Sequence, residues 1–140
     1  MNDKVRIFAF MAVMAAVAAA LPGSGQEPGD KPPKGEKKMH GMVGKMTAVE
    51  GKRDELIAIL LAGTKEMPGC LSYVVAKDPA DATSIWVTEV WDSQASHKAS
   101  LSLPAVQKAI TQGKPMIAKF DSSIVTEPVG GHGLAPLKSR

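Results

Sequence analysis

Few residues of this 140-residue chain have side chains suited to catalysis, and the best candidates lie between positions 73 and 100. Glu89 and Trp91 occupy alternate positions in a β-rich run, so their side chains should share one face of a strand. His97 follows shortly after, and a neutral imidazole can accept the proton of a phenol near pH 7. We therefore take Glu89, Trp91 and His97 as the candidate catalytic residues.

Each of these three side chains also has a purely structural interpretation. Trp91 either stacks on a planar ligand or closes the core where the sheet meets a helix. Glu89 has apolar neighbours on its own face, which would raise its pKa and suit a base, but an ion pair across a dimer explains it equally well. His97 is either a base or a solvated helix position.

Ligand binding and metal binding have fewer candidates. Tyr73 carries a phenol that could bond a ligand hydroxyl, and Tyr73 and Trp86 line either a cavity or a dimer interface. No metal site is expected, because His40 and His132 are far apart in sequence and lack paired ligands. The single cysteine, Cys70, excludes an internal disulfide, and we expect an inert, half-buried thiol.

The elements that position these residues follow the order β-α-β-β-α-β. Hydrophobic spacing and turn residues predict strands at 40–49, 70–77, 83–91 and 117–126, and helices at 52–66, 93–102 and 104–113. This order makes a four-stranded antiparallel sheet with its helices on one face. The other face would expose apolar side chains, so we expect a homodimer that packs sheet to sheet.

Three motifs, in this order along the chain, are shared with a known family: Gly51-Lys52-Arg53-Asp54-Glu55-Leu56, Pro68-Gly69-Cys70 and Glu89-Val90-Trp91-Asp92-Ser93-Gln94-Ala95. Together they resemble the antibiotic biosynthesis monooxygenase (quinol monooxygenase-like) superfamily, over residues 39–127. The resemblance implies a ferredoxin-like α+β subunit of a dimeric α+β barrel, with a small apolar cavity between sheet and helices. It also implies oxidation of a phenol or quinol by molecular oxygen without metal, flavin or other cofactor.

Two departures from the family pattern bear on catalysis. The resemblance implies one histidine where Ser100 stands and another where Ala105 stands, and both are missing. We keep Ser100 as a substrate-binding position. His97 precedes it on the same helix by three residues, a rotation of about 60°, and is a neighbour of that position rather than its equivalent. The Asn, Trp and His set of haem-degrading relatives cannot be placed either, so haem degradation is not expected.

The remaining segments predict export. In residues 1–21, a basic start is followed by a short apolar stretch that ends in Ala18-Ala19-Ala20, a pattern that indicates a signal peptide. The alternative is an uncleaved membrane anchor, although the stretch is shorter than the ~20 residues of a membrane span. Residues 22–38 are rich in Pro, Gly and charge and predict a disordered linker, residues 39–128 form the domain, and residues 129–140 a flexible tail. We expect a secreted or periplasmic protein without stable membrane insertion after cleavage.

The net charge of the predicted domain limits the kinds of molecule that it can bind. The chain carries +3 overall, but residues 39–128 hold nine Lys/Arg against ten Asp/Glu, a net charge of −1, which excludes a basic footprint for nucleic acid. The expected partners are a small aromatic or quinol-like molecule and a second copy of the chain.

The leading interpretation is an exported, cofactor-independent monooxygenase-like protein. One alternative is a non-catalytic dimeric barrel that binds a small apolar ligand, as in a stress response, and the other is a structural dimer module.

Overall fold

Four strands and four helical segments make up residues 38–134, the part of the chain that the computed structural model describes. Its strands are β1 (His40–Ala48), β2 (Cys70–Lys77), β3 (Ser84–Trp91) and β4 (Ile117–Thr126), and its helices are α2 (Arg53–Gly63), α3 (Gln94–Ser100), α4 (Pro104–Gly113) and the 3-10 helix η2 (Lys114–Met116). The expected ferredoxin-like β-α-β-β-α-β order is confirmed, with the second helical region divided into α3 and α4. The expected signal peptide, most of the expected linker and the end of the expected tail lie outside the described residues.

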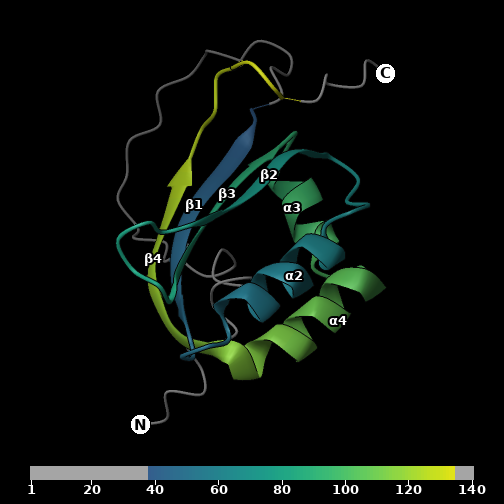
Figure 1. Ribbon diagram of the computed structural model, residues 1–140. Coiled ribbons are helices and arrows are strands. Elements are labelled where there is room, and N and C mark those ends of the chain that lie inside the picture. The colour runs from purple at the N-terminus through teal and green to yellow at the C-terminus, as the bar shows by residue number, and fades with distance from the viewer. Residues whose placement is uncertain (1–37, 135–140) are drawn as a thin grey trace, which may run out of the picture.

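The four strands form one sheet in the order β2-β3-β1-β4, and every neighbouring pair is antiparallel. The helices lie on one face of this sheet, and no helix or strand of residues 38–134 covers its other face (Figure 1). We call these the inner and the outer face. No helix among the described residues is long and apolar enough to cross a membrane.

Helix α2 begins and ends where local chemistry favours a break. Gly51 takes a φ of +74°, a left-handed conformation that glycine adopts without strain, and so turns the chain out of the first strand. The carboxylates of the first helical turn favour the positive end of the helix dipole. The helix ends at Gly63, three residues before the expected 66, where the hydroxyl of Thr64 donates to the carbonyl of Leu61.

Glycine also lets helices α2 and α4 approach closely. A Cβ atom placed on Gly63 would lie 2.6 Å from the Cβ of Ala109, a distance that real side chains do not reach. The two helices therefore touch backbone to side chain and cover the inner face together. The opposite end of the sheet is covered by α3, whose N-cap residue Ser93 accepts a hydrogen bond from the backbone N–H of Ser96 at 3.2 Å.

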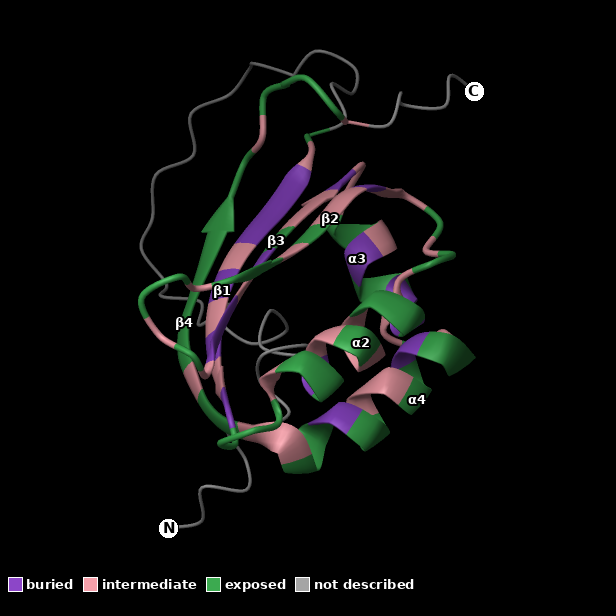
Figure 2. Cartoon of the chain, viewed as in Figure 1, coloured by how far each residue is buried: buried purple, intermediate pink, exposed green. Residues whose placement is uncertain are grey.

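The core lies between α2 and the inner face of the sheet. It consists of side chains that are almost fully buried: Met46, Ala48, Leu56, Ile85 and Val87. Figure 2 shows this burial along β1 and β3, whereas β4 is exposed over most of its length. On the outer face, paired positions bring Val74, Thr88, Val43 and Ile124 into one row across all four strands.

Leu56 tests the contribution of this core to stability. Its side chain is 0% exposed, so Leu56→Ala should lower the free energy of unfolding by about 2–5 kcal/mol in urea or guanidinium titrations. Leu61 on the same helix is 48% exposed, and Leu61→Ala should cost less than about 1 kcal/mol. Equal losses for the two variants would show that the helix, rather than the packing of Leu56, determines stability.

Candidate active site

Two adjacent rows of paired residues build the candidate site on the inner face of the sheet. Glu89 of β3 pairs with Met42 of β1 and with Tyr73 of β2. In the next row on this face, Trp91 pairs with His40 and with Cys70. Strand pairing therefore brings side chains from three strands together at one end of the sheet, next to α3.

Glu89 and Trp91 contact each other directly, as their alternate positions on one strand allow. The indole Nε1 of Trp91 donates a hydrogen bond to Glu89 Oε2 at 2.9 Å. Trp91 is buried and Glu89 is largely covered. The indole thus fixes the orientation of a carboxyl group that has little access to water.

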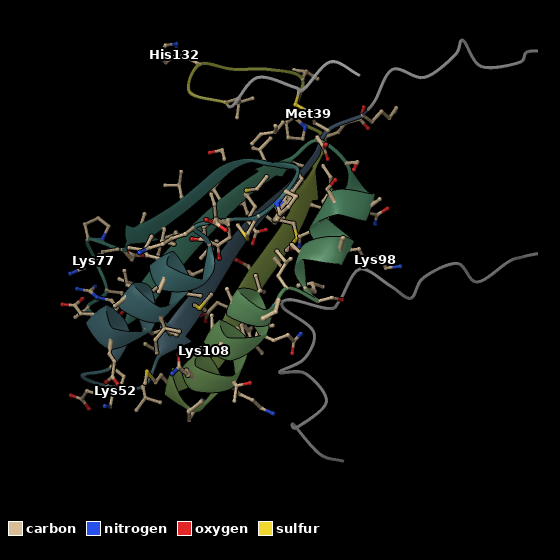
Figure 3. The ribbon with its side chains drawn as sticks, turned by 90° about the vertical axis from the view of Figure 1, so that its right-hand side faces the viewer. Met39, Lys52, Lys77, Lys98, Lys108 and His132 are labelled. Carbon is tan, nitrogen blue, oxygen red and sulfur yellow. The ribbon has the colours of Figure 1, made fainter. Side chains whose placement is uncertain are left out.

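His97 completes this group from α3. Its Nε2 lies 3.7 Å from Glu89 Oε2, and its ring centroid lies 5.3 Å from that of Trp91. The side chain is only 6% exposed, so the interpretation as a solvated helix position is wrong. The N-cap at Ser93 sets the rotation of α3 so that His97 faces the sheet, while its neighbour Lys98 points away into solvent (Figure 3).

A small pocket opens beside these residues, between the inner face and the three helices. Its cavity volume is about 20 Å³. It is lined by Leu60, Gly63, Thr64, Met67, Tyr73, Glu89, Trp91, His97, Ser100, Leu101, Val106 and Ala109. This volume holds about one water molecule, so an aromatic ligand must displace side chains to enter. Met67 is suited to such movement, because its unbranched side chain adopts many shapes.

Four of the sequence-based candidates share this pocket with His97: Tyr73, Glu89, Trp91 and Ser100. Ser100 donates its hydroxyl hydrogen to the backbone carbonyl of His97 at 2.7 Å, which leaves only its oxygen lone pairs for a ligand. Tyr73 thus takes the first of the two expected placements, cavity or interface.

Trp86 does not line the pocket, which corrects its expected role in substrate binding. It lies on the outer face, where its indole Nε1 donates to Asp78 Oδ2 at 3.0 Å. The ammonium of Lys45 sits 5.3 Å from the ring and also pairs with Asp78 at 3.1 Å. Neighbouring strand positions point to opposite faces, so Trp86 and Trp91, five residues apart, are separated by the sheet.

Burial controls the protonation of the site. It raises the pKa of Glu89, an effect that the N–H of Trp91 partly offsets. Burial also lowers the pKa of His97, and the neighbouring His40 lowers it further. The carboxyl group of Glu89 and the imidazole of His97 lie 3.7 Å apart, within ion-pair range, but burial opposes the charge on either group. A neutral imidazole retains a lone pair for a proton.

Burial also favours the neutral forms of the two other titratable groups in these rows. Burial raises the pKa of the Tyr73 phenol, and the nearby Glu89 raises it further. Burial also raises the pKa of the Cys70 thiol to about 11, which supports the expectation of an inert, half-buried cysteine. Among the described residues, no group of three or more His, Cys, Asp or Glu side chains is arranged to hold a metal ion.

His40 is the residue at this site that sequence reasoning missed. It is 7% exposed, and its ring centroid lies 5.3 Å from that of His97. The alternation of β1 places it on the same face as Met42, but only the register with β3 brings it opposite Trp91. No signal in the sequence fixes that register.

Comparison with known proteins agrees with this fold. The model of the antibiotic biosynthesis monooxygenase family matches residues 39–112. The chain belongs to this family. A protein from Chloroflexus aurantiacus whose name places it among the antibiotic biosynthesis monooxygenases is 63% identical, with a TM-score of 0.68, and the match covers 69% of this chain and 99% of that one. Among curated proteins, none matches.

More distant structures share the fold of the antibiotic biosynthesis monooxygenase family. Proteins named for this activity from Caulobacter crescentus and Nitrosomonas europaea are 19% and 10% identical, each with a TM-score of 0.61. The matches cover 67% and 65% of this chain and 92% and 90% of those chains. The match of the family model over residues 39–112 confirms the family expected from the three sequence motifs.

The variant Glu89→Gln tests the protonation of the site. Because burial raises the pKa of Glu89, the folded state keeps its proton at pH values where the unfolded chain has released it. Glu89 therefore lowers the free energy of unfolding as the pH rises above the ordinary carboxyl pKa. Gln lacks this titration and still accepts the Trp91 hydrogen bond. The free energy of unfolding of the variant, relative to that of wild type, should therefore rise from about pH 4 to about pH 7.

Urea unfolding at both pH values measures this difference. The exposed Glu66→Gln is the matched control and should follow the wild-type pH dependence. A Glu89→Gln protein that loses stability at pH 7, and loses less at pH 4, would mean that Glu89 is charged and paired in the folded state.

Proposed function

We propose that this antibiotic biosynthesis monooxygenase family member oxidises a small phenol or quinol with molecular oxygen, without a cofactor. The observation that carries the proposal is the neutral imidazole of His97, buried in a pocket beside Glu89, Trp91 and the Tyr73 phenol. Family membership supports the reaction type. Substrate class is inferred from the pocket chemistry: an aromatic ring and a hydroxyl with a proton to give.

The proposed reaction needs few protein groups. A phenolate is electron-rich enough to pass an electron to oxygen, so the protein has to bind the phenol, accept its proton and hold the anion. One oxygen atom then enters the ring, the other leaves as water, and the ring loses two hydrogens to become a quinone. Atoms and electrons balance with oxygen as the only oxidant.

Each residue of the pocket has a role in this proposal. His97 accepts the phenolic proton, and the carboxyl group of Glu89, 3.7 Å away, compensates the imidazolium that forms when that carboxyl group is ionised. Trp91 orients Glu89 through its N–H. Tyr73 can donate its phenolic hydrogen to the ligand anion, because burial keeps that group protonated.

A non-catalytic ligand-binding protein is the second candidate. The buried indole of Trp91 is compatible with it, because a tryptophan that closes the core need not take part in a reaction. The serine and alanine at Ser100 and Ala105, where the family resemblance implies histidines, also favour it. Such a protein would take up a small apolar ligand and release it unchanged.

We also propose that two copies of the chain pack outer face to outer face. The row that crosses this face includes Val74 and Ile124, which are 52% and 58% exposed. An apolar row without a cover is typical of an interface rather than of a solvated surface. Trp86 and Lys45 lie one row away on the same face and would border the contact.

Export is a further part of the proposal, and it rests on the sequence of residues 1–38. A cleaved signal peptide would release the domain outside the cytoplasm on its Pro- and Gly-rich linker. Expression in a bacterial host, followed by N-terminal sequencing of the exported form, should give a chain that begins near residue 22. Recovery of only the full-length chain from the membrane fraction would favour the uncleaved anchor.

Oxygen uptake tests the proposed reaction. The chain should consume oxygen above the spontaneous rate with at least one compound from a panel of hydroquinones and anthrone-type phenols. His97→Gln removes the base and should lower kcat/KM by about 100-fold or more. Trp91→Phe keeps the ring but removes the donor to Glu89, and should lower it as well. His132→Gln, in the exposed tail segment, is the control and should match wild type.

Tryptophan fluorescence separates the two candidates. No uptake above the spontaneous rate with any compound, combined with saturable quenching that Trp91→Phe abolishes, would establish the binding protein instead. Turnover unchanged in His97→Gln would remove His97 from the mechanism.

Light scattering after size exclusion tests the dimer. At micromolar concentration the protein should run at twice the mass of one chain, and Ile124→Lys or Val74→Lys should convert it to a monomer by placing a charge in the apolar row. Ala62→Lys, on the exposed surface of α2, should leave the mass unchanged. A monomeric wild-type protein would contradict the proposed interface.

A further inference from the structure

His40 is buried without a function in the fold or in the reaction proposed above. Its Nε2 is the one buried side-chain nitrogen or oxygen atom without a hydrogen-bond partner in the part of the chain that the structure describes. A buried polar atom without a partner costs free energy, about 1–3 kcal/mol for a typical group. A phenylalanine would fill the same place without an unpartnered polar atom, so packing alone does not explain an imidazole at this position.

The position of His40 connects it to the candidate base. It pairs with Trp91 across β1 and β3, and its ring lies 5.3 Å from the ring of His97, with the planes tilted by 31°. The ring of Trp91 lies 5.3 Å from His97 as well. His97 is thus flanked by Trp91 and His40, both of which come from the sheet.

We propose that His40 is a positioning residue for His97: near neutral pH the two imidazoles hold at most one proton between them, a second proton binds only at lower pH, and His40 thereby sets the pH below which His97 no longer serves as a base. The part that concerns catalysis rests on the proposed function; the sharing of one proton by the two rings does not.

Charges around the pair support a limit of one proton. Glu89 of β3 is the carboxyl group that contacts it, at 3.7 Å from His97 Nε2, and it can compensate one positive charge. The titratable groups of β2 in these rows, Cys70 and Tyr73, are held neutral by burial. At the same end of the sheet, Lys38 and Glu127 pair with each other at 3.1 Å and are exposed, and Lys98 of α3 points into solvent (Figure 3).

A second proton would therefore be costly. It would place two like charges about 5 Å apart in a site that has one compensating carboxyl group. Burial opposes the charged form of either ring, and it lowers the pKa of His40 as it does that of His97. No hydrogen bond fixes Nε2 of His40 as a donor or an acceptor. This nitrogen can therefore bind or release the proton that the two rings share.

Nuclear magnetic resonance of the histidine rings tests this inference in the full chain. In wild type, the two rings should titrate in two steps, and the ring that is protonated second should have the lower midpoint. We expect that ring to be His97, so His40→Gln should raise the His97 midpoint by roughly half a pH unit or more, the size of a charge effect over 5.3 Å even in water.

Three further variants complete the experiment. His97→Gln shows whether His40 instead is the ring protonated second, in which case its midpoint rises by a similar amount. His40→Phe keeps a ring in the same place without a charge and should reproduce the effect of His40→Gln, which covers the case in which Gln disturbs the fold. His132→Gln, in an exposed segment, should move neither midpoint.

The outcomes are distinct. If neither ring changes its midpoint by more than about 0.1 unit when the other is removed from a folded protein, the inference is wrong, because a coupling of this size is far below a charge at that distance. If the midpoints change but no phenol or quinol is oxidised, the pair exists and the proposed function fails. If the protein is active, the acid limb of its kcat/KM profile should move with the His97 midpoint in His40→Gln.

Discussion

The register of β3 against β1 and β2 is the constraint on which the site depends. Pairing of Trp91 with His40 and Cys70, and of Glu89 with Tyr73, collects the inner-face side chains of three strands at the end of the sheet that α3 covers. Because strand side chains alternate, a slip of one residue would send Glu89 and Trp91 to the outer face. Fully buried residues on the same strand, such as Ile85, oppose such a slip, because it would expose them too. The packing of the core and the geometry of the site are thus fixed by the same interaction.

The two faces of this sheet treat polar groups in opposite ways. On the inner face, burial favours uncharged forms of Glu89 and His97, and a single N–H from Trp91 is the main polar support of the carboxyl group. On the outer face, Asp78 stays charged because the N–H of Ala80, the indole of Trp86 and the ammonium of Lys45 all stabilise its carboxylate and lower its pKa. The indole of Trp91 therefore donates to a buried carboxyl group whose uncharged form is favoured, and the indole of Trp86 donates to a carboxylate that is part of a salt bridge.

Sequence alone predicted much of the fold but only part of the site. Hydrophobic spacing located every element of the sheet, and strand alternation correctly placed Glu89 and Trp91 on one face. It could not tell that His97 is buried, because the rotation of α3 depends on its cap at Ser93 and on packing against the sheet. It also could not tell which face becomes the inner one, and so it grouped Trp86 with Tyr73. His40 was missed because its neighbours come from strands far away in sequence.

The contact between Gly63 and Ala109 has a consequence for how anything reaches the pocket. Helices α2 and α4 touch so closely there that parting them would break a close contact, and Gly69 approaches Ser96 of α3 equally closely, since a Cβ atom on it would lie 2.5 Å from that side chain. Any widening of the 20 Å³ cavity should thus come from side chains of its lining that can change shape, of which the unbranched Met67 is the most adaptable. We expect the shapes that these side chains can adopt, rather than movement of the helices, to limit the size of the ligand that the protein admits.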